Sequence, residues 1–150
     1  MFTNILVALD GSKVSRRALI EAVDLARLMN AKIHAIHVME AAASAQNSLD
    51  QMNTSVELYR LLEKEGKGVL EEANRYCADQ GIAIIPHLKQ GNAGTGIIAL
   101  SEQEKCDLIV VASQGKSGFD RLFLGSVSSY VVKNNKGTTL VVRGQEKTES

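Results

Sequence analysis

The chain has 150 residues, of which 45% are hydrophobic and 23% are charged, values typical of one globular domain rather than a disordered chain. Seventeen basic residues balance seventeen acidic ones, so no basic excess is available for a nucleic-acid backbone, and we expect no nucleic-acid partner. No apolar run approaches the ~20 residues of a membrane span, and the N-terminus lacks a signal-peptide pattern, which predicts a cytoplasmic protein without membrane insertion.

The first third of the chain has the pattern of a strand, a helix and a second strand. Residues 4–9 form a continuous apolar run that is too short for a helix and ends at Asp10 and Gly11, as expected for a strand covered on both faces. Ser12 is a favourable N-cap, and apolar residues then recur at helical spacing until Asn30. Residues 32–39 are the second predicted strand.

The middle of the chain predicts a long helix and an edge strand. Residues 40–53 are polar and without a clear period, which predicts a mobile surface segment. An amphipathic helix follows from residue 56 to 77, although Gly66 and Gly68 cost about 1 kcal/mol each relative to alanine, and Gly81 closes it. Residues 82–88 predict a third strand, and since Pro86 cannot donate to a ladder, that strand lies at an edge of the sheet.

The C-terminal third carries the most hydrophobic strand. A short helix containing Ile97, Ile98 and Leu100 precedes residues 107–113 (DLIVVAS), which predict the central strand. A glycine-containing loop at 114–124 leads to a helix over 126–134 and a last strand over 138–143. We expect one domain over 1–144 and a polar, frayed tail over 145–150.

The alternation of strands and helices predicts an α/β fold with an open parallel five-stranded sheet and helices on both faces. The expected strand order is 3-2-1-4-5, in which the neighbouring strands 1 and 4 have connections that leave in opposite directions. Ligands bind at the carboxyl ends of such a pair. The candidate site is therefore the ends of these two strands.

Two glycines and two serines at that place suit an anion. Gly115 and Gly125 let backbone amides approach a phosphate, and Ser126 and Ser128 add hydroxyl donors at the start of the last helix, where amides are unsatisfied. Spacing alone fits a structural turn and cap equally well. The location at the switch point, opposite Asp10, favours binding.

Asp10 ends the first strand, where its carboxylate can accept a hydrogen bond from a ribose hydroxyl or help hold a phosphate-bound metal. Its alternative role is structural, in an Asx turn at the start of the following helix. The position at the switch point favours the functional role.

Other site motifs are absent. The residues 115–117 (GKS) resemble the end of a P-loop, but Val110 stands where that motif needs glycine. The glycines within 91–96 form GxxGxG rather than the dinucleotide fingerprint, and we expect them to be turn and N-cap residues. No arrangement assembles a catalytic nucleophile, base and acid, so we predict no catalytic residue and at most slow nucleotide hydrolysis.

The histidines and cysteines do not form a predicted metal site. His34 and His37 have opposite strand parity, so they face opposite sides of the sheet and share no metal or catalytic dyad, and His87 lies on the edge strand. Cys77 and Cys106 are isolated, which argues against zinc or a disulfide and predicts two buried, inert thiols.

The sequence resembles the universal stress protein family over essentially the whole chain. Four segments carry the resemblance: NILVALDGS at 4–12, AIHVME at 35–40, DLIVVASQGKSGFDRLFLGSVSSYVV at 107–132 and TTLVVR at 138–143. The family's nucleotide-binding motif is Gly, two residues, Gly, nine residues, Gly, then Ser or Thr. Gly115, Gly125 and Ser126 match its last three elements, while Ala112 replaces the first glycine.

The resemblance implies an adenine nucleotide alpha hydrolase-like fold that binds ATP, alone or with Mg²⁺, and a stress-response regulator with a protein partner still unknown. It implies that Ala8, Leu9 and Asp10 flank the ribose and base, that the Val38 backbone contacts adenine, that Ala112, Gln114 and Gly115 lie along the ribose and phosphates, and that Gly125, Ser126, Val127 and Ser128 hold the phosphates. It also implies a homodimer paired through the last strand, an apolar edge.

Two alternatives remain open on the sequence. The first is a nucleotide-free universal stress protein that acts as a dimeric interaction module, which Ala112 favours. The second is a hydrolase or transferase of an adenylated substrate, against which the absence of an SGGxDS-type pyrophosphate loop argues.

Overall fold

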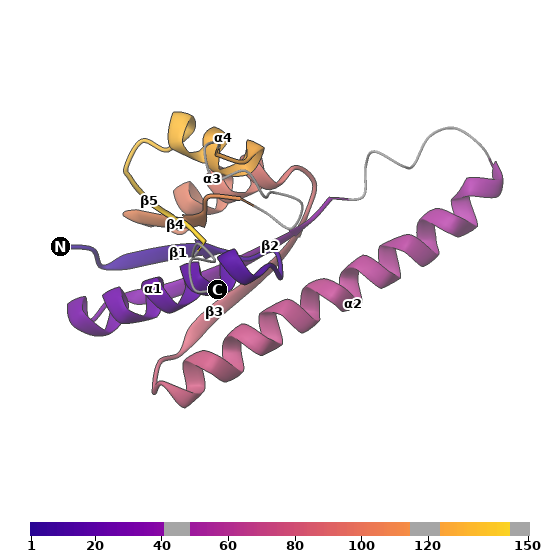
Figure 1. Cartoon of the computed structure of the whole chain (residues 1–150). Helices are drawn as coiled ribbons and strands as arrows, with labels where there is room; N and C mark the ends of the chain where they lie inside the picture. Colours follow the sequence, from indigo (N-terminus) through magenta and orange to yellow (C-terminus); the bar gives the residue numbers. More distant parts are fainter. Residues whose placement is uncertain (41–48, 115–123, 145–150) are drawn as a thin grey trace, which may run out of the picture.

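A parallel five-stranded sheet with the order β3-β2-β1-β4-β5 forms the centre of the molecule (Figure 1). The computed structural model describes residues 1–40, 49–114 and 124–144. The strands are β1 (Asn4–Ala8), β2 (Lys32–Met39), β3 (Ile84–Gln90), β4 (Leu108–Ala112) and β5 (Thr138–Val142). The predicted strand order is confirmed, and β3, which contains Pro86, lies at an edge as expected.

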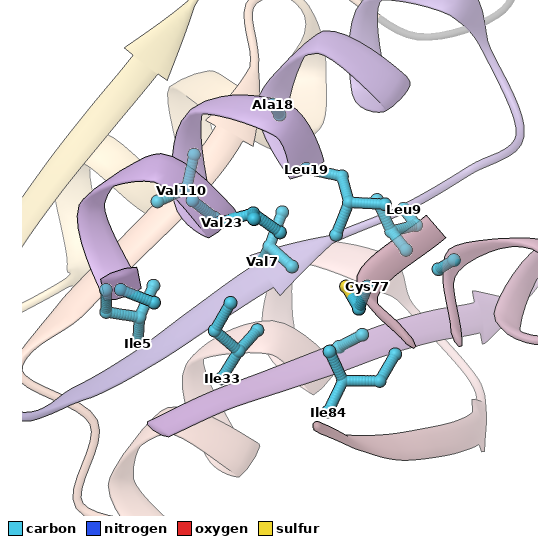
Figure 2. Close-up of a cluster of buried hydrophobic side chains, with 14 of the residues drawn as sticks. Ile5, Val7, Leu9, Ala18, Leu19, Val23, Ile33, Cys77, Ile84 and Val110 are labelled. Carbon is cyan, nitrogen blue, oxygen red and sulfur yellow. The ribbon is translucent and has the colours of Figure 1, made fainter. Parts of the chain in front are cut away.

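Helices cover both faces of the sheet, as predicted. The helices α1 (Lys13–Met29) and α2 (Leu49–Asp79) pack on one face, and α3 (Ala93–Gln103) and α4 (Ser126–Asn134) pack on the other. Ile5 and Val7 of β1 enter the first cluster of buried side chains, beside Leu19 and Val23 of α1 (Figure 2). Leu6 enters a second cluster, on the other face of the sheet. Because β1 is buried on both faces, apolar and polar residues do not alternate along it.

The predicted start and end of α1 and the predicted C-terminal end of α2 are confirmed by their caps. The Ser12 hydroxyl accepts a hydrogen bond from the Ser15 amide at 3.1 Å, so α1 begins directly after it. Asn30 ends α1 in the left-handed conformation, with φ of 53°, and Gly81 follows α2 with φ of 75°. Each cap ends or begins a helix directly beside the strand that it connects.

Two element boundaries differ from the sequence prediction. The helix α2 begins at Leu49, so residues 49–53 are helical and not part of a loop. Extending an existing helix costs far less than nucleating one, and these first turns of α2 project beyond the sheet (Figure 1). The strand β3 begins at Ile84 because the amides of Gly81 and Ile82 bond back to the end of α2. Residues 41–48 and the predicted tail at 145–150 lie outside the described residues.

The glycines near residue 91 were expected to be turn and N-cap residues, which is correct only for the turn. Gly91 is in the turn, with φ of 131°, but Asn92 caps α3 by accepting from the Thr95 amide at 3.0 Å. Gly94 and Gly96 lie inside α3, where they give space to neighbouring side chains. A Cβ on Gly94 would lie 2.7 Å from the Tyr130 ring, so this glycine lets α4 approach α3 closely.

Candidate functional site

A cavity of about 320 Å³ lies where β1, β2 and β4 end and α3 and α4 begin. Ten of the sequence-predicted site residues line it: Ala8, Leu9, Asp10, Val38, Ala112, Gln114, Gly125, Ser126, Val127 and Ser128. Gly115 lies outside the described residues. The fold therefore brings together, at one switch point, residues that are separated by more than a hundred positions in the chain.

Six further residues line the cavity that sequence reasoning did not select: Ser15, Ile36, Glu40, Ala93, Ile97 and Val111. Ile36, Ile97 and Val111 are almost fully buried, and with Ala8 and Val38 they form an apolar side that suits a flat, weakly polar ring. Glu40 stands at the polar rim, where its carboxylate accepts from the Ala93 amide at 2.8 Å and caps α3. Strand parity could have indicated which face of the sheet Ile36 is on, but only the structure shows that α3 packs against it.

The start of α4 also lines the cavity. Gly125 occupies the N-cap position, and no side chain of the described residues caps this helix. The first amide with an acceptor inside the helix is that of Ser129, which bonds to the Gly125 carbonyl at 2.9 Å. The amides of residues 126–128 precede it and carry the partial positive charge of a helix N-terminus, so they suit an anion.

The Ser128 hydroxyl is not placed as the sequence predicts, as a donor to a phosphate. Its hydroxyl is buried and lies 2.9 Å from the Ser113 carbonyl and 3.1 Å from the Gly125 carbonyl, so its proton is used within the protein. The Gly125 amide also donates to the Ser113 carbonyl, at 2.7 Å. Ser128 thus ties α4 to the end of β4, and of these two serines only Ser126 is exposed.

The turn after β1 presents Asp10 to the cavity. Gly11 has φ of 85°, which favours glycine, and the Ser12 amide donates to Asp10 Oδ1 at 2.9 Å. This Asx turn is the structural role that the sequence left open for Asp10. The other carboxylate oxygen, Oδ2, has no hydrogen-bond partner among the described residues, so a carboxylate remains at the cavity wall.

His34 and His87 meet on the face covered by α3 and α4, a pairing that the sequence did not predict. His34 Nδ1 lies 3.0 Å from His87 Nε2, and His34 Nε2 lies 3.1 Å from the Asn4 side-chain oxygen. Desolvation lowers the pKa of both imidazoles, and the neighbouring His34 lowers that of His87 further. In the part of the chain that the structure describes, no three His, Cys, Asp or Glu side chains come together in a metal-binding group.

The two cysteines have raised thiol pKa values and lie outside the cavity. Cys77 is fully buried as predicted, whereas Cys106 is only half-buried, because it precedes β4, which begins at Leu108. Burial is the main cause that raises the pKa of each thiol to about 11, so both are protonated near neutral pH. Neither thiol lines the cavity.

Comparison with known proteins decides the family. A family model described as the universal stress protein family matches residues 1–143. The chain belongs to the universal stress protein family. Universal stress protein YxiE of Bacillus subtilis is 33% identical to it, over 95% of this chain and 100% of the relative.

Two solved universal stress protein structures are also similar. The protein UspA from Lactobacillus plantarum has a TM-score of 0.85 and 26% identity, over 94% of this chain and 97% of that one. A universal stress protein in complex with cAMP has a TM-score of 0.68 and 25% identity, over 95% of this chain and 97% of that one. Among the described residues, no helix combines the length and the apolar character needed to cross a bilayer.

Proposed function

We propose that this universal stress protein binds ATP in the cavity at the carboxyl ends of β1 and β4. The observation that carries the proposal is the uncapped start of α4, which faces the same cavity as an apolar side made by Ile36, Val38 and Ile97. Adenine suits the apolar side, and the phosphates suit the amides of residues 126–128. A related universal stress protein has been solved with cAMP, an adenine nucleotide, which supports the class of ligand.

Asp10 lines the same cavity and is proposed to bind the ribose or a phosphate-bound Mg²⁺. The ligand distances that Mg²⁺ needs are short, and it is usually held by one or two carboxylates together with phosphates and water. The Asp10 carboxylate at the cavity wall fits that pattern. No catalytic residue is proposed, and turnover beyond slow hydrolysis is not expected.

Ala112 is the feature that favours a second function, a nucleotide-free interaction module. It lines the cavity in the place of the family's first motif glycine. However, its φ is not positive, so the alanine is unstrained, and it adds only one methyl group to the cavity wall. This geometry favours the ATP-binding proposal over the module.

We further propose that the protein acts as a cytoplasmic homodimer through β5 and that ATP controls a surface for a regulatory partner. The strand β5 is an edge of the sheet, with Leu140 and Val141 only partly buried, and edges of this kind are seldom left unpaired. Val132 of α4, a helix in contact with β5, is a further exposed apolar side chain, at 46%. Two free cysteines agree with a reducing compartment.

Mass spectrometry of ligand released from freshly purified, denatured protein tests the function. The proposal predicts an adenine nucleotide, and calorimetry of the stripped protein with ATP and Mg²⁺ should then show saturable binding. The interaction-module alternative predicts a dimer that releases no nucleotide and gives no heat with ATP. That result would remove the ATP proposal.

A further inference from the structure

We infer that His37 is a positioning residue for the nucleotide site and that it links the site to α2, an inference that depends on the proposed ATP binding. His37 lies on β2 and is 7% exposed, on the face covered by α1 and α2. Its Nδ1 lies 2.8 Å from the carbonyl oxygen of Leu9, in a buried contact between residues 28 positions apart. A carbonyl only accepts, so Nδ1 carries the proton and donates it.

The Leu9 carbonyl belongs to the peptide group that leads into Asp10. The amide at the other end of this peptide group, that of Asp10, lies 3.3 Å from Ser15 Oγ, and Ser15 is buried in the first turn of α1. His37 and Ser15 therefore hold the two polar ends of one peptide plane. Rotation of that plane would move the Asp10 carboxylate and the Leu9 backbone, both of which line the cavity.

Gly66 of α2 fixes the imidazole from the other side. A Cβ at this position would lie 2.8 Å from His37 Cδ2 and 2.6 Å from Leu88 Cδ1, distances that real Cβ atoms do not adopt. The ring thus occupies the space that a side chain on α2 would fill, and α2 packs directly over it. This close approach explains a buried glycine in the interior of a helix, where glycine is otherwise unfavourable.

The contacts form a continuous path from the middle of α2, through the imidazole, to the turn that presents Asp10. A displacement of α2 over His37 would change the Leu9 peptide plane, and a ligand that orders this turn would, by reciprocity, favour the packed position of α2. His37 is not a binding residue in this account, because it does not line the cavity. It acts through Leu9.

The test compares four variants of the full chain: His37→Leu, His37→Asn, Gly66→Ala and Gly68→Ala. His37→Leu removes the donor while keeping an apolar volume, whereas the amide of His37→Asn can replace Nδ1 as donor to Leu9. Gly66→Ala and Gly68→Ala give the same gain in helix propensity on the same helix. Only the Cβ added by Gly66→Ala would contact His37, because nothing lies within 4 Å of a Cβ on Gly68.

Two quantities are measured at a temperature where every variant is folded: the calorimetric Kd for ATP with Mg²⁺, and the hydrogen exchange of ligand-free protein. We expect His37→Leu to weaken ATP binding about tenfold, the size of one lost buried hydrogen bond. His37→Asn should recover most of the affinity, Gly66→Ala should weaken binding roughly threefold or more, and Gly68→Ala should leave it unchanged. The Asp10 and Ser12 amides should exchange faster in His37→Leu, with the β4 amides unchanged.

Wild-type affinity in both His37→Leu and Gly66→Ala protein would overturn this inference alone. Exchange that accelerates equally across β4 and the Asp10 turn would also overturn it, because His37 would then act only on global stability. Absence of ATP binding in the unaltered chain would overturn the proposed function and this inference together. The two failures are therefore distinguishable.

Discussion

Replacing Gly125 by aspartate should remove ATP binding while leaving the fold intact. Gly125 is the N-cap of α4 and has φ of −66° and ψ of 168°, a conformation that any residue adopts. Aspartate is a favoured N-cap, so its carboxylate should accept from the amides that are proposed to bind phosphate. It would also place a negative charge beside a polyphosphate, a repulsion worth several kcal/mol at short range, so we expect a loss of affinity on the order of a hundredfold or more.

Calorimetry with ATP and a thermal unfolding curve check this prediction together. The midpoint of unfolding should stay constant or rise slightly, because α4 gains a cap. Gly125→Asn is the matched control, since asparagine has nearly the same shape and capping ability without the charge. It should lose much less affinity than Gly125→Asp, and an Asp variant that bound ATP as tightly as the unaltered protein would show that phosphates bind elsewhere.

Replacing Asp10 by asparagine should weaken ATP binding about tenfold, the second largest effect expected at this site. Asparagine keeps the oxygen that accepts from the Ser12 amide, so the Asx turn should persist. What is lost is the charge of the carboxylate at the cavity wall. Calorimetry with AMP and with ATP, each with and without Mg²⁺, measures the effect.

The pattern of loss across ligands identifies the role of Asp10. An equal loss for AMP and ATP, independent of Mg²⁺, indicates a bond to the ribose, whereas a loss confined to ATP with Mg²⁺ indicates a metal contact. Asp10→Ala is the companion variant, because it removes the turn as well and should lower the unfolding midpoint. Unchanged affinity for every ligand in the asparagine variant would leave Asp10 with a structural role only.

Much of the fold was predictable because strand order follows from local signals. Buried parallel strands appear as continuous apolar runs, and Pro86 assigns one of them to an edge because proline lacks an amide proton. The candidate site followed from the same reasoning, since the switch point of such a sheet can be located from strand order alone. Asp10, Ala112 and Gly125 line the cavity, and their place in the site could therefore be predicted from the sequence.

Contacts between side chains were not predictable, because parity gives the face of a strand but not its register. The pair His34 and His87 depends on how β3 aligns with β2, and these residues are 53 positions apart. The Ser128 hydroxyl was expected to face a phosphate, and only its position relative to the Ser113 carbonyl shows otherwise. For His37, strand parity excludes a metal shared with His34 but does not reveal that the partner of its Nδ1 is a backbone carbonyl.

The full length of α2 also escaped prediction, for a different physical reason. Amphipathic periodicity detects the part of a helix that packs against a core, and the start of α2 projects beyond the sheet (Figure 1). Gly66 lowers the helix propensity of this segment, yet the imidazole of His37 occupies the space that a side chain at position 66 would need. A glycine in a helix interior can therefore mark a close contact that sequence alone does not reveal.

The most direct test of the central claim follows the backbone amides by NMR while the stripped protein is titrated with ATP and, separately, with adenosine. If the start of α4 binds phosphates beside Asp10, ATP should shift the amides of Ser126, Val127 and Ser128 together with those of Leu9 and Val38. Adenosine should shift only the latter two. Saturation with ATP that leaves the three α4 amides unmoved would contradict the account.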